Sequence, residues 1–151
     1  MIHAIADLLT PELIHLDVTA QDAFGAITKV AARLEGNPAI RDFDEFLQAV
    51  ISREKVSPTV SPQGVAFPHA RTKCVSRIVM AVGRSPIGLT FKSCAHKIHL
   101  VFLIGTPPES AREYLALLGG LARLLKEEKL RQSLLQAATA EELIESIRRA
   151  G

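Results

Sequence analysis

His69 lies in a sequence setting that suits nucleophilic chemistry. It follows Pro68 in the segment Gly64-Val-Ala-Phe-Pro-His-Ala-Arg71. A proline has a fixed φ and favours extended geometry at the residue before it, so a strand entering here would present the imidazole in a defined direction. Nearby arginines and hydroxyls could together bind phosphoryl oxygens through charge and hydrogen bonds: Arg53, Arg71, Ser57, Thr59 and Ser61. From these residues alone, a purely structural histidine remains an equally good interpretation.

The basic residues are concentrated in the middle of the chain. The whole sequence has 18 Lys and Arg against 16 Asp and Glu, a net charge of +2 that does not by itself indicate a nucleic-acid partner. Residues 53–97, however, contain eight basic residues and one acidic residue, a net charge of +7, which leaves 10 basic and 15 acidic residues and −5 elsewhere. A cationic setting favours the neutral imidazole, the form that attacks phosphorus. The charge pattern is therefore consistent with an anion-handling site around His69.

The elements that would position these residues can be predicted from apolar spacing and capping residues. The alternation in 13–18 predicts a strand. A helix is expected from a capping-box-like start at Thr19 and Asp22 to a stop near Gly36, and a second from Asp42 to about 53–56. The two prolines in 57–64 predict a loop before His69.

The second half of the chain is predicted to supply the remaining strands and two or three helices. Strands are expected at 65–67, 75–83 and 98–104. A helix with a stripe of leucines along it is expected to start at 106–109, and Thr139 is expected to cap a last helix. The stripe consists of Leu115, Leu118, Leu121 and Leu125. This order predicts an α/β fold of one domain, with a mixed parallel and antiparallel sheet of about five strands flanked by helices on both faces.

Length and composition exclude several classes of protein. A chain of 151 residues with 48% hydrophobic and 23% charged residues fits one globular domain and no disordered or fibrous class. The two cysteines, Cys74 and Cys94, are too few for a disulfide scaffold, and no signal peptide or membrane-length apolar run is evident, so we expect a cytoplasmic protein without a membrane span. No nucleotide or hydrolase motif occurs, and we expect no cofactor.

The segment around His69 resembles a motif of a known protein family. Gly64-Val-Ala-Phe-Pro-His69-Ala is similar to the Gly-x-Ala-x-Pro-His block of the enzyme IIA domains of the phosphotransferase system, fructose/mannitol class, which includes the nitrogen-regulatory branch. Arg53-Glu54 looks like the family's Arg-Glu, and Thr59 like its loop threonine. Residues 98–104 and the helix after Pro108 are similar to its later strand and helix. The resemblance implies one enzyme IIA-like domain over 1–151.

The resemblance implies that His69 is the catalytic residue and accepts a phosphoryl group. The donor would be an HPr-like phosphocarrier protein or its nitrogen-branch equivalent, and the recipient an enzyme IIB domain or a regulatory target protein. By the same resemblance, Arg53 binds the phosphoryl oxygens, and Thr59 orients the histidine or donates to the phosphate. Tyr114 and Ser61 are candidate supporting residues of the site. Many members carry a second histidine where this chain has Tyr114, whose hydroxyl supplies no imidazolium charge near neutral pH. The alternative is a phosphorylation-silent regulatory domain that binds a transporter or kinase.

A metal site and a nucleic-acid-binding module are the two further functions that the residue types suggest. A metal site could use Cys94, His96 and His99, but in an extended segment the first two share one face and His99 points to the other, so we expect no metal. A nucleic-acid module is disfavoured by the small total charge and by the absence of a helix-turn-helix or zinc-finger pattern.

Overall fold

The computed structural model describes residues 5–92 and 94–151, whose strands form a mixed five-stranded sheet. The strands are β1 (Ile14–His15), β2 (Val65–Ala66), β3 (His69–Arg71), β4 (Val79–Leu89) and β5 (Ile98–Thr106). The long strands β4 and β5 are antiparallel, β1 runs parallel to β4, and β2 and β3 run parallel to the other edge of β5. The predicted α/β fold with a mixed sheet of about five strands is confirmed.

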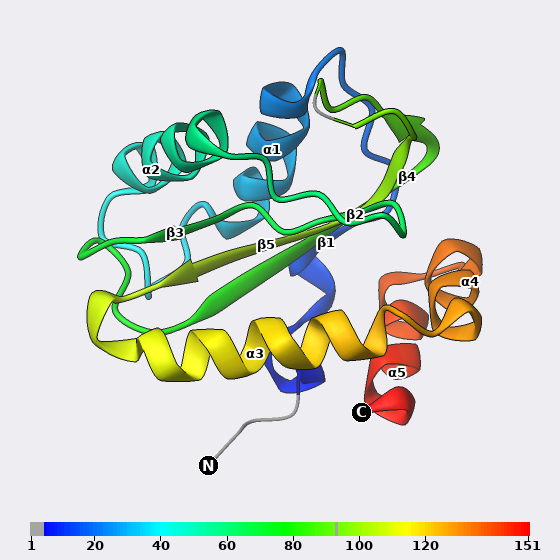
Figure 1. Cartoon of the computed structure of the whole chain (residues 1–151). Helices are drawn as coiled ribbons and strands as arrows, with labels where there is room; N and C mark the ends of the chain where they lie inside the picture. Colours follow the sequence, from blue (N-terminus) through cyan, green and yellow to red (C-terminus); the bar gives the residue numbers. More distant parts are fainter. Residues whose placement is uncertain (1–4, 93) are drawn as a thin grey trace.

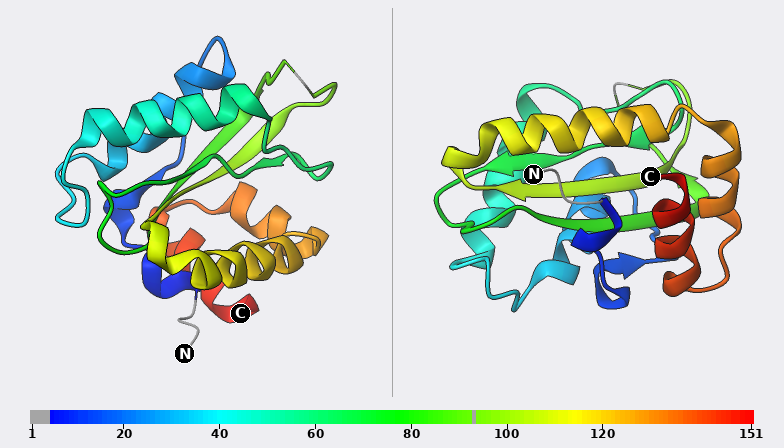
Figure 2. Two further views of the ribbon diagram at one scale, coloured as in Figure 1. Left: turned by 60° about the vertical axis from the view of Figure 1, so that its left-hand side comes forward. Right: turned by 90° about the horizontal axis from the view of Figure 1, so that it is seen from below.

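Helices cover both faces of the sheet, as predicted (Figures 1 and 2). One face carries α1 (Ala23–Ala31) and α2 (Phe43–Val56), and the opposite face carries α3 (Ala111–Leu124), with α4 (Glu128–Gln136) and α5 (Ala140–Ala150) beyond its end. Short 3-10 turns complete the order: η1 (Ile5–Leu8), η2 (Pro11–Leu13), η3 (Ala32–Leu34) and η4 (Pro108–Ser110). Every residue of β5 except His99 is buried, because both of its faces are covered.

A buried arginine fixes α4 to the sheet. Arg84 of β4 is only 7% exposed, and its Nε donates to Leu16 O at 3.1 Å. Its Nη1 donates to the carbonyls of Leu134, Leu135 and Ala137 at 3.0, 3.3 and 2.6 Å. The last carbonyls of a helix have no intrahelical partner and carry its negative dipole end, so the guanidinium satisfies the end of α4 with a matching charge.

Side-chain caps define where three of the helices begin. Asp42 accepts from Glu45 N at 3.1 Å and Thr139 from Glu142 N at 3.1 Å, at the two predicted starts. The first helix begins later than the predicted start at Thr19, because Asp22 is the cap and accepts from Gly25 N at 2.8 Å. Gly36, the predicted stop, follows η3 with φ +83°, a left-handed conformation that favours glycine.

Two strand predictions need correction. The strand predicted at 13–18 is shortened to Ile14–His15, because residues 11–13 form η2 and Asp17 N turns back toward His15 Nδ1 at 3.4 Å. The strand predicted at 75–83 starts later, since Val75 N closes a turn onto Thr72 O at 3.2 Å, and it runs on to residue 89. A register irregularity between Arg84 and Leu89 accommodates Pro86 and Gly88 within the strand.

The helix predicted to start at 106–109 also begins later. Thr106 is a fully buried residue at the end of β5, and its carbonyl accepts from Thr72 N at 2.9 Å, so it continues the sheet. The 3-10 turn at 108–110 then leads into α3. The predicted leucine stripe is partly wrong as well, because Leu115 is 64% exposed and Leu117 takes the buried position.

Candidate active site

His69 begins the edge strand β3, which lies between α2 and α3 (Figure 1). It pairs in register with Ile104 of β5, whose backbone N donates to Pro68 O at 3.0 Å. Because the proline fixes its own φ and its carbonyl is held by the central strand, the backbone leading into His69 is firmly positioned. The imidazole is half-buried.

One ring nitrogen of His69 is held by the backbone. Nδ1 lies 3.0 Å from the carbonyl oxygen of Phe67. A carbonyl can only accept a hydrogen bond, so this contact assigns the proton to Nδ1 and leaves the lone pair on Nε2. The arrangement therefore orients the ring and keeps Nε2 as an available nucleophile.

A pocket of about 390 Å³ contains the imidazole. Its polar lining comes from β3 and from the two helices on either side of it. The lining residues are Ala49 and Arg53 of α2, His69, Ala70 and Arg71 of β3, and Ala111, Tyr114 and Leu115 of α3. The fold thus brings together three of the sequence-predicted site residues, His69, Arg53 and Tyr114, which lie on three different elements. The two arginines make the pocket suited to an anion.

Tyr114 lies against the His69 ring, with ring centroids 5.2 Å apart and planes inclined by 35°. Burial raises the pKa of the Tyr114 hydroxyl above its ordinary value of 10.0, and the nearby positive charge of Arg53 opposes this shift only in part. The phenol therefore keeps its proton at neutral pH. Tyr114 can thus donate a hydrogen bond to an anion in the pocket.

Arg53 occupies the last turn of α2, where a side chain can reach the carbonyls at the helix end. Its Nη1 donates to Ser57 O at 2.9 Å, which anchors the half-buried guanidinium across the end of the helix. Among residues 5–92 and 94–151 it forms no ion pair, so its other N–H groups have no carboxylate to neutralise them. It can bind an oxyanion with those donors.

Thr59 does not line the pocket; it binds a buried carboxylate instead. Its Oγ1 donates to Glu54 Oε1 at 2.7 Å and its backbone N to Glu54 Oε2 at 3.3 Å. The carbonyl of Thr59 accepts from Phe67 N at 2.9 Å, and Phe67 in turn accepts from His69. Glu54, only 6% exposed, had no role assigned from sequence, although it is the single acidic residue in 53–97. Its isolation in a basic segment, and its place in the Arg53-Glu54 pair that resembles the family motif, were the available signals in the sequence.

Ser61 also lies outside the pocket lining. Its hydroxyl is buried and has no hydrogen-bond partner among the described residues, and its carbonyl accepts from His96 Nε2 at 3.1 Å. The sulfur of Cys94 is 3.2 Å from the same His96 nitrogen, whereas His99 Nδ1 donates to Ser85 O at 2.8 Å on another segment. Within the part of the chain that the structure describes, His, Cys, Asp and Glu side chains form no group of three suited to a metal ion. No helix described there is long and apolar enough to cross a membrane.

Comparison with known proteins identifies the family. Residues 7–150 match the family model for the phosphoenolpyruvate-dependent sugar phosphotransferase system, EIIA 2. The fructose-specific EIIA component of Haloferax volcanii is 33% identical over 131 residues, which cover 85% of each chain. The fructose-specific EIIABC component of Bacillus subtilis is 31% identical over 144 residues, 95% of this chain, but this chain spans only 23% of that longer protein.

The solved structures show the same fold. The nitrogen regulatory protein IIA-Ntr from Neisseria meningitidis superposes with a TM-score of 0.86 at 25% sequence identity, covering 95% of this chain and 98% of that one. Both sugar-transport and nitrogen-regulatory proteins are thus among its relatives. With a family match over nearly its whole length, the chain belongs to the EIIA 2 family of the phosphoenolpyruvate-dependent sugar phosphotransferase system.

Proposed function

We propose that His69 carries the phosphoryl group in this chain, by attack of its Nε2 on phosphorus. The observation that supports this most is the contact of Nδ1 with Phe67 O at 3.0 Å, which leaves the Nε2 lone pair free within a cationic pocket. The Nε2–P bond forms as the bond between phosphorus and the donor's nitrogen breaks, and that electron pair returns to the donor. The Nδ1 proton stays on His69, so the step needs no added base.

The groups around His69 then act on the charge of the phosphoryl group. Phosphoryl transfer depends mainly on positioning and electrostatic stabilisation, with little covalent work for other residues. Arg53 and Arg71 line the pocket as cations, and Tyr114 adds a hydroxyl donor. In this proposal Arg53 binds phosphoryl oxygens, while Thr59 acts as a positioning residue, through Glu54 and Phe67, rather than as a phosphate donor. Ser61 receives no role.

The donor in this proposal is an HPr-like phosphocarrier, and the recipient is an enzyme IIB domain or a regulatory target. The relative from Bacillus subtilis is named as an EIIABC component, in which an A part is joined to B and C parts. The structural relative from Neisseria meningitidis is named as a nitrogen regulatory protein. These names support a IIB partner and a regulatory target respectively. The pocket chemistry is the same for both recipients.

Phosphorylation in vitro tests the proposal. The chain is incubated with phosphoenolpyruvate, enzyme I and a phosphocarrier, and its intact mass is measured. We expect one added phosphoryl group on the wild type and on the control variant His99→Ala, and none on His69→Ala. Two-dimensional NMR of the labelled imidazole then distinguishes Nε2 from Nδ1 attachment.

Two results would reject the carrier function. Equal labelling of wild type and His69→Ala would show that another residue accepts the group. The wild type could also remain unlabelled with every phosphocarrier tried while an enzyme IIA used as a positive control is labelled. That result would favour the alternative of a phosphorylation-silent domain that binds a transporter or kinase. The substitution of Tyr114 for a second family histidine is the observation behind that alternative.

A further inference from the structure

A second and larger pocket lies on another side of α3. Its volume is about 710 Å³, within the range of about 300–1,000 Å³ typical of small-molecule sites. Tyr114 and Leu115 of α3 line the His69 pocket, whereas Glu113, Ala116 and Leu117 of the same helix line this one. The two pockets therefore share a helix but no lining residue. Nothing in the proposed phosphoryl transfer uses the second pocket.

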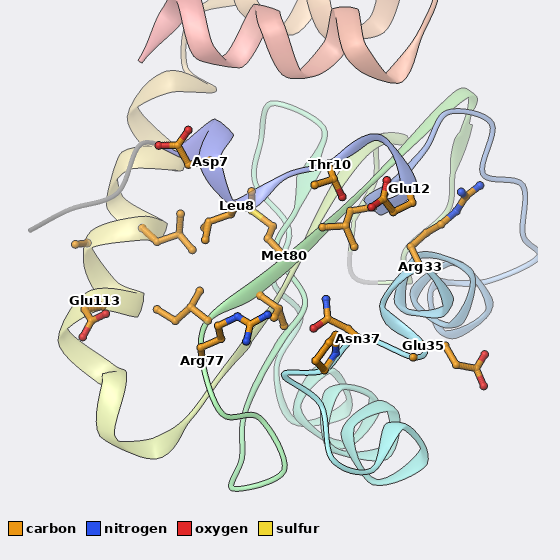
Figure 3. A pocket seen from close by; sticks show the side chains of 17 residues that line it. Asp7, Leu8, Thr10, Glu12, Arg33, Glu35, Asn37, Arg77, Met80 and Glu113 are labelled. Atoms are coloured by element: carbon orange, nitrogen blue, oxygen red, sulfur yellow. The ribbon is translucent and has the colours of Figure 1, made fainter.

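The floor of the second pocket is apolar and comes from separate elements. Leu13 of η2, Met80 of β4 and Leu117 of α3 are all at least nine-tenths buried, and Leu8 of η1 lies half-buried beside them. Figure 3 shows Leu8 and Met80 on the inner side of this pocket. A hydrocarbon chain placed on this floor would lose its contact with water, which is favourable.

Hydrogen-bond donors converge over this floor. Asn37 Oδ1 accepts from Ala39 N at 2.9 Å, which assigns the carbonyl side of the amide, and its NH₂ group has no acceptor among residues 5–92 and 94–151. In Figure 3 the amide of Asn37 and the guanidinium of Arg77 both point into the central part of the pocket. In the described ranges, Arg77 has neither a salt bridge nor a hydrogen bond from its side chain. The lining of the pocket thus includes a guanidinium and an amide NH₂ group.

We propose that this second pocket binds an organic monocarboxylate with an apolar body. A carboxylate can accept two parallel hydrogen bonds from Arg77 and a third from Asn37, while its carbon chain covers the apolar floor. The lining also carries the cation Arg33 and four acidic residues, Asp7, Glu12, Glu35 and Glu113, of which only Asp7 forms an ion pair, with Arg148, within the described residues. Their negative charge opposes a doubly charged phosphate more strongly than a singly charged carboxylate. This inference is independent of the phosphoryl-carrier function.

Titration with octanoate tests the inference directly. Isothermal titration calorimetry on the whole chain, supported by NMR shifts of Asn37 and Met80, should show one octanoate bound per chain. Octanol has the same apolar body without the charge, so we expect it to bind at least about tenfold more weakly, a difference typical of one charge-assisted contact. Octylphosphate should also bind more weakly than octanoate.

Two variants and one control assign the binding to the pocket. Asn37→Asp keeps an oxygen for Ala39 N but replaces the NH₂ donor with a negative oxygen, so the local fold is retained and the carboxylate is repelled. Arg77→Gln removes the cation. Each should weaken octanoate binding at least about tenfold. Arg149→Gln, at an exposed position of α5 outside this lining, should bind like the wild type.

The outcomes decide the inference without reference to phosphorylation. Thermal unfolding of each variant first establishes that it is folded. The inference is overturned if octanoate fails to bind the wild type at 10 mM, on the order of the weakest useful affinity. It is also overturned if octanol binds as tightly, or if octylphosphate binds more tightly. Unchanged octanoate affinity in both Asn37→Asp and Arg77→Gln would equally exclude this pocket.

Discussion

The hydroxyl of Thr59 connects a buried carboxylate to the backbone that orients His69. It donates to Glu54 at 2.7 Å, and the same residue's carbonyl accepts from Phe67 N at 2.9 Å. Phe67 in turn accepts from His69 Nδ1 at 3.0 Å. Thr59→Val preserves the size and branching of the side chain but removes this hydroxyl. We expect both the stability of the chain and the rate of His69 phosphorylation to fall.

The expected loss of stability in Thr59→Val follows from the charge and burial of Glu54. A hydrogen bond to a charged group contributes about 1.5–3 kcal/mol, and Glu54 is only 6% exposed, so water replaces the lost donor poorly. We expect Thr59→Val to reduce the free energy of unfolding by about 2 kcal/mol. For a chain of this size that corresponds to a decrease in Tm of roughly 4–8 °C. Looser positioning of the imidazole should slow phosphorylation about tenfold.

Urea unfolding and quenched intact-mass measurements provide the two readouts. Thr90→Val is the matched control: its exposed hydroxyl accepts from Lys97 Nζ at 2.8 Å, and we expect a loss of no more than about 0.5 kcal/mol. A double-mutant cycle with Glu54→Gln isolates the pair. The hydrogen bond between Thr59 and Glu54 does not have this role if Thr59→Val is no more destabilising than Thr90→Val, or if the cycle gives no coupling between residues 54 and 59.

Three further predictions concern other parts of the molecule. Tyr114→Phe keeps the ring beside His69 but removes a hydrogen-bond donor. The rate of phosphorylation, measured by intact mass, should therefore fall about tenfold, while the free energy of unfolding in urea stays unchanged. An unchanged rate would remove Tyr114 from the proposal. Arg84→Met leaves the carbonyls at the end of α4 without their cation, so urea unfolding should show a loss of about 3 kcal/mol, and a loss below that of Thr90→Val would contradict this account. Burial, with Arg33 adding to it, lowers the pKa of His15 from its ordinary 6.5. The unfolded chain therefore binds more protons, and stability should decrease as pH falls below about 6.5, less so in His15→Gln; equal pH slopes would exclude His15 as the source.

Local features of the sequence predicted the centre of the candidate site and most of the elements that hold it. Pro68 fixes its own φ and restricts the backbone of Phe67 before it, so the direction in which the chain enters His69 depends on adjacent residues. The beginnings of the helices at Asp42 and Thr139 could also be predicted from nearby residues, because a capping side chain accepts from a backbone N–H only three residues away. The uninterrupted apolar run in β5 indicated a strand with two covered faces.

Tertiary structure decided what depends on contacts between distant residues. The residues at which β4 begins and ends depend on its pairing with β5 and on the register irregularity after Arg84. Neither feature can be recognised from the spacing of apolar residues. The contact between the Tyr114 and His69 rings requires α3 and β3 to meet, and the second pocket requires η1, η2, β4 and α3 to enclose one space.

The role of Thr59 shows the same division within the site. Sequence similarity singled out the residue, but its hydroxyl points to Glu54 rather than into the pocket of His69. The choice between a phosphate and a buried carboxylate as its acceptor is set by how α2 and the following loop pack together. The sequence by itself therefore determined which residues could do the chemistry, because residue type and backbone restriction are local properties. Only the packed structure decided which of them meet, because burial and hydrogen-bond partners come from parts of the chain far apart in sequence.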